Sequence, residues 1–322
     1  MNEQSKKSPL LIILGPTASG KTQLAVQVAL RINGEILSAD SRQVYRDMDI
    51  GTGKDLNEYT VEGITIPYHL INILDAGGRY NVNDFQHDFE KVCQQIISVN
   101  HVPIVCGGTG FYIYSLLKGH AYASIPVDDP LRNDLETLPN EALVAKFRSA
   151  ETAYYRVADI STRKRLIRAI EIADFLIANP DEQFSLSEQS SDYDAIIFGL
   201  NPNVEVRRDR ITHRLNQRLQ NGMVEEVQRL LNRGLSKEQL VYYGLEYKYI
   251  TQYLTGEIGY NSMKIKLETE IHRFAKRQMT FFRKMEKDGF HINWLSEEMS
   301  QEEKIRLILD RYREFKSKLA GI

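Results

Sequence analysis

The chain has 322 residues, with 41 lysines and arginines against 43 aspartates and glutamates, and its formal net charge is −2. This length suits one large domain and a smaller one, and the balanced charge excludes a uniformly basic protein, so any polyanion must be bound by a local basic patch. The two cysteines, Cys93 and Cys106, are too few for a disulfide framework or a cysteine zinc site, which favours a reduced cytoplasmic protein whose cysteines fill the core.

The first elements in chain order alternate between strand and helix. Residues 1–8 are polar and are expected to form a flexible tail, without a signal peptide or a membrane span. Short apolar runs at 10–14, 34–40 and 102–106 predict buried strands, while 23–32 and 83–99 have the spacing of amphipathic helices. This alternation predicts an α/β fold, in which helices flank a parallel sheet.

The pattern changes after Pro126. Residues 128–190 show helical periodicity and no strand pattern, notably at 140–150 and 162–178, and we interpret them as a helical insertion domain. A returning strand is predicted at 193–200, followed by helices at 204–221, 262–287 and 297–319. The catalytic core is therefore expected to comprise residues 9–127 and 191–322.

A phosphate-binding P-loop directly follows the first predicted strand. It consists of Gly15, Pro16, Thr17, Ala18, Ser19, Gly20, Lys21 and Thr22. The glycines let consecutive backbone amides point at phosphate oxygens, and the next helix adds the positive end of its dipole. Lys21 supplies a point charge, and Thr22 is placed to offer its hydroxyl to Mg²⁺. The motif predicts binding of a diphosphate or triphosphate, but it does not choose between a kinase, an NTPase and another diphosphate-using enzyme.

Two further polar positions follow predicted strands. Asp40 ends the second strand, and strand carboxyl ends are where ligands bind in open α/β sheets. Its carboxylate could hold magnesium or act as a general base, and a plain turn aspartate is the alternative. A glycine-rich turn after the third strand places backbone amides and the Thr109 hydroxyl on the same rim as the P-loop.

Three segments concentrate positive charge. Residues 163–168 contain four cations and no acid, and residues 264–287 contain eight lysines and arginines against three acids, which favours binding of a polyanion. A third group follows one face of a predicted helix and consists of Arg207, Arg210, Arg214 and Arg218. These arginines could project onto a diphosphate leaving group or pair with nearby acids, and the sequence leaves both interpretations open.

Taken in their order along the chain, these segments resemble those of the bacterial tRNA dimethylallyltransferases, also called tRNA isopentenyltransferases. Six blocks carry the resemblance, at 15–22, 40–52, 69–75, 107–112, 165–171 and 275–283. It extends over nearly the whole chain, from about residue 9 to residue 294, and six ordered blocks are far more specific than a P-loop alone. The family resemblance implies a P-loop NTPase-like fold and transfer of a dimethylallyl group from dimethylallyl diphosphate to N6 of the adenosine 3′ of the anticodon.

The resemblance also implies roles for individual residues. Asp40 matches the general base, and Thr109 matches the hydroxyl residue that approaches the target nucleotide. Lys21, Thr22 with Mg²⁺ and Arg214 would stabilise the departing diphosphate. The expected tRNA contacts are Ser41, Arg42, Gln43, Arg132, Lys164, Arg165, Leu166, Ile167, Arg168, Lys276, Arg277 and Gln278. The helical insertion would clasp the anticodon arm, and the family is mostly monomeric.

The chain departs from the family pattern in two places that concern the site. Gly53 and Asp55 stand where relatives commonly have alanine and proline, and Glu246 precedes Tyr247 where a glycine is usual. Three other functions share some of these features: prenylation of free adenine nucleotides, a small-molecule P-loop kinase whose insertion is a lid, and a tRNA-binding protein without activity. The basic segments argue against the first of these.

Overall fold

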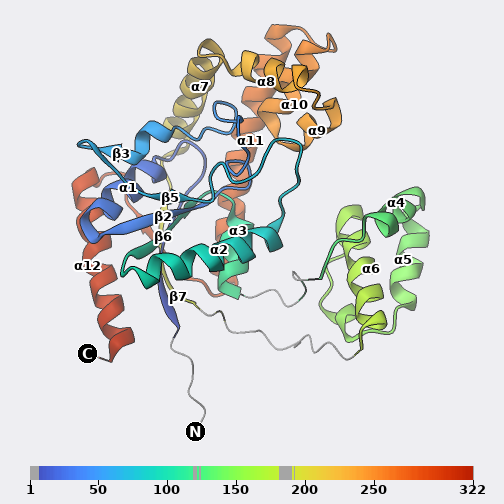
Figure 1. Ribbon diagram of the computed structural model, residues 1–322, viewed down its shortest axis with the longest axis horizontal. Helices are drawn as coiled ribbons and strands as arrows, with labels where there is room; N and C mark the ends of the chain where they lie inside the picture. The colour runs from blue at the N-terminus through green and yellow to red at the C-terminus, as the bar shows by residue number, and fades with distance from the viewer. Residues whose placement is uncertain (1–6, 119–121, 123–124, 181–190, 192, 322) are drawn as a thin grey trace. The chain divides into compact units, whose positions relative to one another are not determined.

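The computed structural model describes residues 7–118, 122, 125–180, 191 and 193–321. The chain divides into two compact units, of which the first comprises Met1–Leu117 and Asp192–Ile322 and the second Lys118–Ser191. The insertion expected at 128–190 falls within the second unit, although residues 181–190 lie outside the described part, as do residues 1–6 of the expected tail. In Figure 1, where colour follows residue number, the helices of the second unit are green, and the first unit runs from blue to teal and from yellow to red.

Strands and helices alternate along the first unit and give way to helices in the second. The strands are β1 (Ser8–Leu14), β2 (Gly34–Ala39), β3 (Thr60–Val61), β4 (Ile64–Thr65), β5 (Tyr68–His69), β6 (Val102–Gly107), β7 (Tyr193–Leu200) and β8 (Ile292–Leu295). The helices are α1 (Lys21–Ile32), η1 (Leu56–Tyr59), α2 (Val82–Ser98), α3 (Gly110–Lys118), α4 (Asp129–Thr137), α5 (Asn140–Ser149), η2 (Ala153–Arg156), α6 (Arg163–Ala178), α7 (Val204–Gln220), α8 (Met223–Asn232), α9 (Lys237–Tyr242), α10 (Leu245–Leu254), α11 (Tyr260–Lys287) and α12 (Gln301–Ala320).

A six-stranded sheet forms the centre of the first unit. Its strand order is β5-β2-β6-β1-β7-β8, and every pairing in it is parallel. The four apolar runs predicted as strands are β1, β2, β6 and β7, so the predicted α/β class with a parallel sheet is confirmed. The edge strands β5 and β8 were not predicted. Strands β3 and β4 form a separate antiparallel pair.

Alternate residues of β1 belong to two hydrophobic clusters, one on each face of the sheet. Leu10, Ile12 and Leu14 pack with side chains of α2 and α11, whereas Leu11 and Ile13 pack with side chains of α1 and α12. A strand buried on both faces must be apolar throughout, which is why β1 appears in the sequence as an unbroken apolar run.

The second unit is helical in its described part, as predicted. Helices α4, α5 and α6 surround a core of their own, to which Leu143, Phe147, Leu166 and Ile170 belong. Asp128 accepts a hydrogen bond from the amide of Leu131 and so caps α4. No helix among the described residues of either unit is long and apolar enough to cross a membrane.

Candidate active site

The P-loop lies between the end of β1 and the start of α1. Gly20 caps α1 with a φ of 83°, a left-handed conformation that favours glycine, and Ala18 has a φ of 60°. The first amides of α1 have no intrahelical partner and lie at the positive end of the helix dipole. The Ser19 hydroxyl is buried and has no hydrogen-bond partner in the described part of the chain. A bound diphosphate would satisfy these donors, so the loop fits the anion expected from the sequence.

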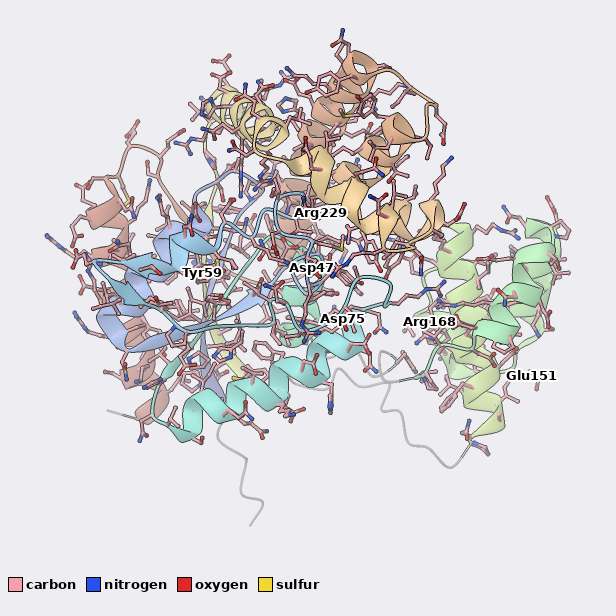
Figure 2. The ribbon with its side chains drawn as sticks, turned by 45° about the horizontal axis from the view of Figure 1, so that its top comes forward. Asp47, Tyr59, Asp75, Glu151, Arg168 and Arg229 are labelled. Carbon is pink, nitrogen blue, oxygen red and sulfur yellow. The ribbon has the colours of Figure 1, made fainter. Side chains whose placement is uncertain are left out.

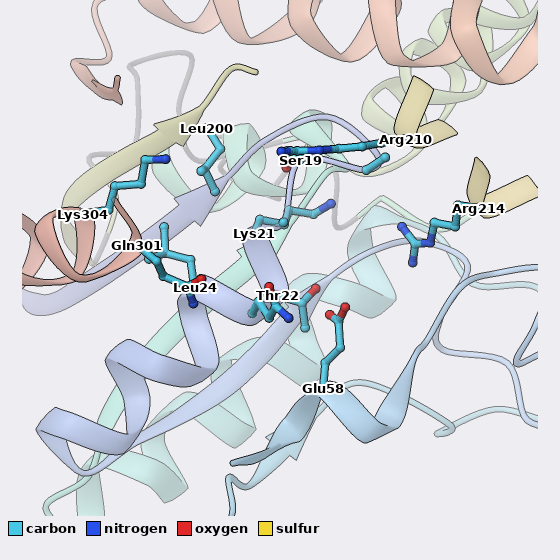
Figure 3. A pocket seen from close by; sticks show the side chains of 13 residues that line it. Ser19, Lys21, Thr22, Leu24, Glu58, Leu200, Arg210, Arg214, Gln301 and Lys304 are labelled. Carbon is cyan, nitrogen blue, oxygen red and sulfur yellow. The ribbon is translucent and has the colours of Figure 1, made fainter. Parts of the chain in front are cut away.

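A cavity of about 480 Å³ lies beside the P-loop and is lined largely by polar and charged side chains. Figure 3 shows Lys21 of α1 and Arg214 of α7 extending toward the same space, which Glu58 of η1 also enters. Burial lowers the pKa of Lys21, and Arg214 lowers it further, while Asp40 acts in the opposite direction. Burial raises the pKa of Glu58. The cavity thus holds cations that an anion would stabilise.

Asp40 and Thr109 come together because they follow two neighbouring strands, β2 and β6. The Thr109 hydroxyl oxygen accepts a hydrogen bond from the Ser41 amide at 3.1 Å, and Asp40 Oδ1 accepts one from the Arg42 amide at 2.9 Å. Both side chains are partly exposed at the carboxyl edge of the sheet. This is the edge where ligands bind in parallel sheets, and it adjoins the P-loop of β1.

The residues after Asp40 are held in place by neighbouring side chains. The Arg42 guanidinium lies over the Tyr242 ring, 5.1 Å from its centroid, which is a cation–π contact. The Gln43 side chain donates to the Gly53 carbonyl at 3.1 Å and accepts from the Ser38 hydroxyl at 3.1 Å. These contacts give the segment a defined conformation next to the base candidate.

Gln278 of α11 has a role that the sequence did not reveal. Its side chain is buried, and its Oε1 accepts a hydrogen bond from the Thr17 amide in the P-loop at 2.9 Å. Its Nε2 donates to the Gly108 carbonyl at 2.8 Å, in the turn that carries Thr109. One amide group therefore joins the P-loop to the glycine-rich turn.

The arginine group on α7 does not act as one unit: Arg207 is buried and does not line the cavity, and burial together with Arg283 lowers its pKa. Arg210 and Arg214 line the cavity, and Figure 3 shows both. Arg214 and Arg218 also form ion pairs with Asp55, a residue whose only signal in the sequence was a departure from the family pattern. The sequence did not predict Glu58 as a residue of the site, because a single acid in a short polar segment carries no sequence signal of its own. Of the two interpretations left open by the sequence, a position at the anion site fits Arg210, pairing with an acid holds for Arg218, and both hold for Arg214.

The chain is similar to known proteins in both sequence and fold. Residues 43–285 match the family model described as IPP transferase. The chain is 48% identical over 306 residues to tRNA dimethylallyltransferase 2 of Bacteroides fragilis, covering 95% of this chain and 98% of that one. It is 47% identical to tRNA dimethylallyltransferase 2 of Porphyromonas gingivalis, covering 94% and 99% respectively. The crystal structure of a tRNA isopentenylpyrophosphate transferase from Bacillus halodurans superposes with a TM-score of 0.71 at 31% identity, over 98% of this chain and 100% of that one.

The chain belongs to the IPP transferase family. The family match covers most of the chain, and the relatives align over nearly their whole length. The fold inferred from the resemblance, a P-loop NTPase-like parallel sheet flanked by helices, is likewise the fold of the superposed structure.

In this family member, two arginines of the second unit bind a buried carboxylate. Arg132 Nε lies 2.7 Å from Glu171 Oε1, and Arg168 Nη1 lies 3.4 Å from Glu171 Oε2. Arg168, labelled in Figure 2, also donates to backbone carbonyls at the start of the unit. Leu166 and Ile167 are buried in the core of the unit. Any RNA contact from this turn of α6 would therefore come from the exposed parts of its cations.

Lys164 and Arg165 are the exposed cations at the start of α6. Arg165 Nη1 lies 2.9 Å from Asp159 Oδ2 and donates to the Ser161 hydroxyl at 2.8 Å. Lys164 is exposed to solvent. The unit thus presents positive charge on a helix whose other face is fixed in the core.

The three tRNA contacts predicted on α11 lie on different faces of the helix. Lys276 and Arg277 are exposed, and the Arg277 guanidinium lies 5.9 Å from the centroid of the Phe274 ring. Gln278, the next residue, faces inward as described above. An exposed aromatic side chain beside cations can contribute stacking as well as charge to a nucleic-acid surface.

The residues around the P-loop fit a magnesium ion only together with a bound anion. Among the described residues, no group of three or more histidine, cysteine or acidic side chains is arranged to hold a metal. Thr22 offers a hydroxyl at the start of α1, next to the cavity. Mg²⁺ commonly takes one or two protein ligands, and phosphate and water oxygens complete its octahedron. The donor set present here fits that mode.

Proposed function

We propose that this protein transfers the dimethylallyl group of dimethylallyl diphosphate to N6 of the adenosine 3′ of the anticodon in tRNA, releasing diphosphate. One observation carries the proposal: a cationic P-loop cavity adjoins a carboxylate and a hydroxyl, those of Asp40 and Thr109, at one edge of the sheet. The cavity accounts for the diphosphate half of the donor. The carboxylate accounts for the proton that an amine must lose when it is alkylated.

The proposed reaction uses each of these groups. The N6 lone pair forms a bond to the allylic carbon as the bond between that carbon and the diphosphate oxygen breaks, and the N6 proton passes to the Asp40 carboxylate. A general base of this kind typically contributes ~10²–10⁴-fold. Lys21 and Arg214 stabilise the negative charge that develops on the diphosphate. Mg²⁺ bound through Thr22 would supply further neutralisation of the same charge.

The acceptor must be presented to this site from outside. An adenosine in an anticodon loop is stacked on its neighbours, so its base has to be flipped out before N6 can meet the donor. We propose that Ser41, Arg42 and Gln43, which follow Asp40 in the chain, contact the flipped base. The exposed cations of α11 and α6 would bind the RNA backbone. We further propose that the enzyme acts as a monomer in the cytoplasm.

Product analysis with alternative acceptors tests the proposal. Purified protein is incubated with Mg²⁺ and donor labelled in its prenyl group, and with unmodified tRNA or AMP as acceptor. Label on tRNA and not on AMP is the expected result. Label on AMP alone would make the protein a nucleotide prenyltransferase. Loss of the γ-phosphate of ATP to a small acceptor, without use of the prenyl donor, would make it a kinase, and tRNA binding without turnover would make it a binding protein.

A further inference from the structure

Two arginines of α7 meet the side chain of Asp55, in the loop before η1. The Asp55 carboxylate pairs with Arg214 and also with Arg218, whose Nη2 lies 3.1 Å from Asp55 Oδ2. Arg214 Nη2 donates in addition to the Gly53 carbonyl at 3.4 Å. Of these two arginines, Arg214 lines the P-loop cavity and Arg218 does not. One carboxylate therefore joins two cations at the edge of a site that has to bind an anion.

The backbone of this loop makes room for the second arginine. A Cβ atom at position 53 would overlap Nη2 of Arg218, so a side chain there would displace the guanidinium. Gly53 also has a φ of 67°, in the left-handed region. Asp55 has a φ of 41°, a conformation that aspartate and asparagine tolerate better than most residues. Both positions are those at which the sequence departs from the family pattern.

The loop that carries Asp55 is anchored on its other side. The buried Lys54 ammonium lies 2.6 Å from the Tyr45 carbonyl oxygen and 2.6 Å from Asp49 Oδ1. Glu226 of α8, also buried, accepts hydrogen bonds from the amides of Asp49 and Gly51 at 2.8 and 3.0 Å. These bonds fix the backbone before Asp55, so its carboxylate is presented to α7 from a defined position.

The charges favour an ionised Asp55. Burial alone would raise its pKa, but Arg214 and Arg218 outweigh burial and bring the pKa below its ordinary value. The two arginines lie one helical turn apart and repel each other, and burial together with Arg214 lowers the pKa of Arg218. The carboxylate offsets this repulsion, which would otherwise drive the two guanidinium groups apart.

We propose that Asp55 is a positioning residue for the transfer reaction: it offsets the charge of Arg218 and holds the Arg214 guanidinium in the orientation that meets the leaving diphosphate. This inference rests on the proposed function. Charge on the leaving group grows as the reaction proceeds, so a pre-oriented guanidinium accelerates bond breaking more than it strengthens ground-state binding. Binding of the intact donor depends mainly on the total positive charge of the cavity, which Asp55 reduces.

Asp55→Asn tests the inference, because asparagine keeps the size and the left-handed backbone and removes only the charge. The transfer rate at saturating donor and tRNA (kcat) should fall about 10- to 100-fold, which at ~1.36 kcal/mol for each factor of ten matches the strength of one charged hydrogen bond. The dissociation constant for dimethylallyl diphosphate with Mg²⁺, measured by calorimetry, should stay the same or become smaller. Asp55→Glu should recover part of the lost rate.

Asp47→Asn is the matched control. Asp47 also has a positive φ, of 61°, and forms an exposed ion pair, with Arg233 Nη1 at 2.6 Å. Its partner Arg233 does not line the P-loop cavity, whereas Arg214, the partner of Asp55, does. Figure 2 labels Asp47. This variant loses an ion pair from the same stretch of chain and should keep the wild-type rate and donor affinity. A rate loss equal to that of Asp55→Asn would show a general effect of loosening the loop and overturn the inference.

A second background separates positioning of Arg214 from other effects. In an Arg214→Gln protein, Asp55→Asn should lower the rate much less than it does in the wild type, because the group to be positioned is absent. An equal loss in both backgrounds would overturn the inference. So would a wild-type rate in Asp55→Asn, or a loss confined to donor affinity. If the wild-type protein itself does not prenylate tRNA, the proposed function fails first and the inference falls with it; the other outcomes leave the proposed function intact.

Discussion

Replacing Gln278 by alanine should uncouple the P-loop from the glycine-rich turn. The side chain accepts from the Thr17 amide and donates to the Gly108 carbonyl, and it is 8% exposed. A buried polar group that loses its partner costs ~1–3 kcal/mol. Water can reach Thr17 beside the open cavity, whereas Gly108 is buried, so we expect a total loss of about 2 kcal/mol in the free energy of unfolding, nearly all of it from the carbonyl.

This loss corresponds to a fall of about 4–8 °C in Tm for a unit of this size, measured by calorimetry or thermal shift. The freed P-loop must be ordered by the donor, so KM for dimethylallyl diphosphate should rise about 10-fold, equivalent to ~1.4 kcal/mol. Thr280→Ala, an exposed change on the same helix, is the control and should shift stability by no more than ~0.5 kcal/mol. A Gln278→Ala protein with the stability and the donor KM of this control would show that the Gln278 side chain does not couple the P-loop to the glycine-rich turn.

Three further predictions concern the chemistry and the RNA. Asp40→Asn should lower turnover at least ~10²-fold while tRNA affinity, measured by filter binding, stays unchanged; wild-type turnover would remove Asp40 as the base. Lys276→Ala combined with Arg277→Ala should weaken tRNA binding and flatten its salt dependence. The slope of log K against log salt concentration should change by about 0.9 or less for each phosphate that is no longer neutralised. Arg313→Ala on α12 should leave this slope unchanged, and an unchanged slope in the double variant would mean that α11 is only a solvated surface helix. Donor affinity should fall as pH rises through the pKa of Lys21, because only the protonated amine attracts the diphosphate. Burial lowers this pKa below the usual ~10.4. Lys21→Arg should bind the donor independently of pH in this range, and a similar fall in that variant would assign the titration to another group.

The central sheet could be predicted because its inner strands are largely buried between two layers of helices, and their sequences are correspondingly rich in apolar residues. The signal is strongest in β1 and β6, which contain unbroken apolar runs, and weaker in β2, which includes Glu35 and Ser38, and in β7, which includes Asp194. The P-loop follows β1 directly. β8 is too short for such a signal and contains Asn293 and Trp294 in its middle. β5 has two residues and is defined only by its pairing with β2.

Local capping residues determine where several helices begin. The last helix was predicted from residue 297 but begins at Gln301, because Ser300 and Glu303 form a capping box that stops it from extending backwards. That signal, serine followed three residues later by glutamate, was present in the sequence. The helices between residues 223 and 254 were not predicted, since their short amphipathic segments are separated by single turns.

The residues of the site also differ in how far the sequence alone could predict their positions. Asp40 and Thr109 lie just after strands β2 and β6, and Lys21 begins the helix that follows the P-loop of β1, so the sheet brings all three to one edge. Gln278 and Asp55 act across long sequence separations, on the P-loop and on α7 respectively. Their partners are determined by how helices pack on the sheet, which no local pattern records.

The proposed transfer to tRNA is tested most directly by mass spectrometry of nucleosides from the anticodon loop of unmodified tRNA, after incubation with the protein, Mg²⁺ and dimethylallyl diphosphate. We expect a dimethylallyl mass gain on the adenosine 3′ of the anticodon with the wild-type protein, and a gain at least ~10²-fold slower with Asp40→Asn. No gain on tRNA under saturating donor, or a gain at another nucleotide only, would contradict it.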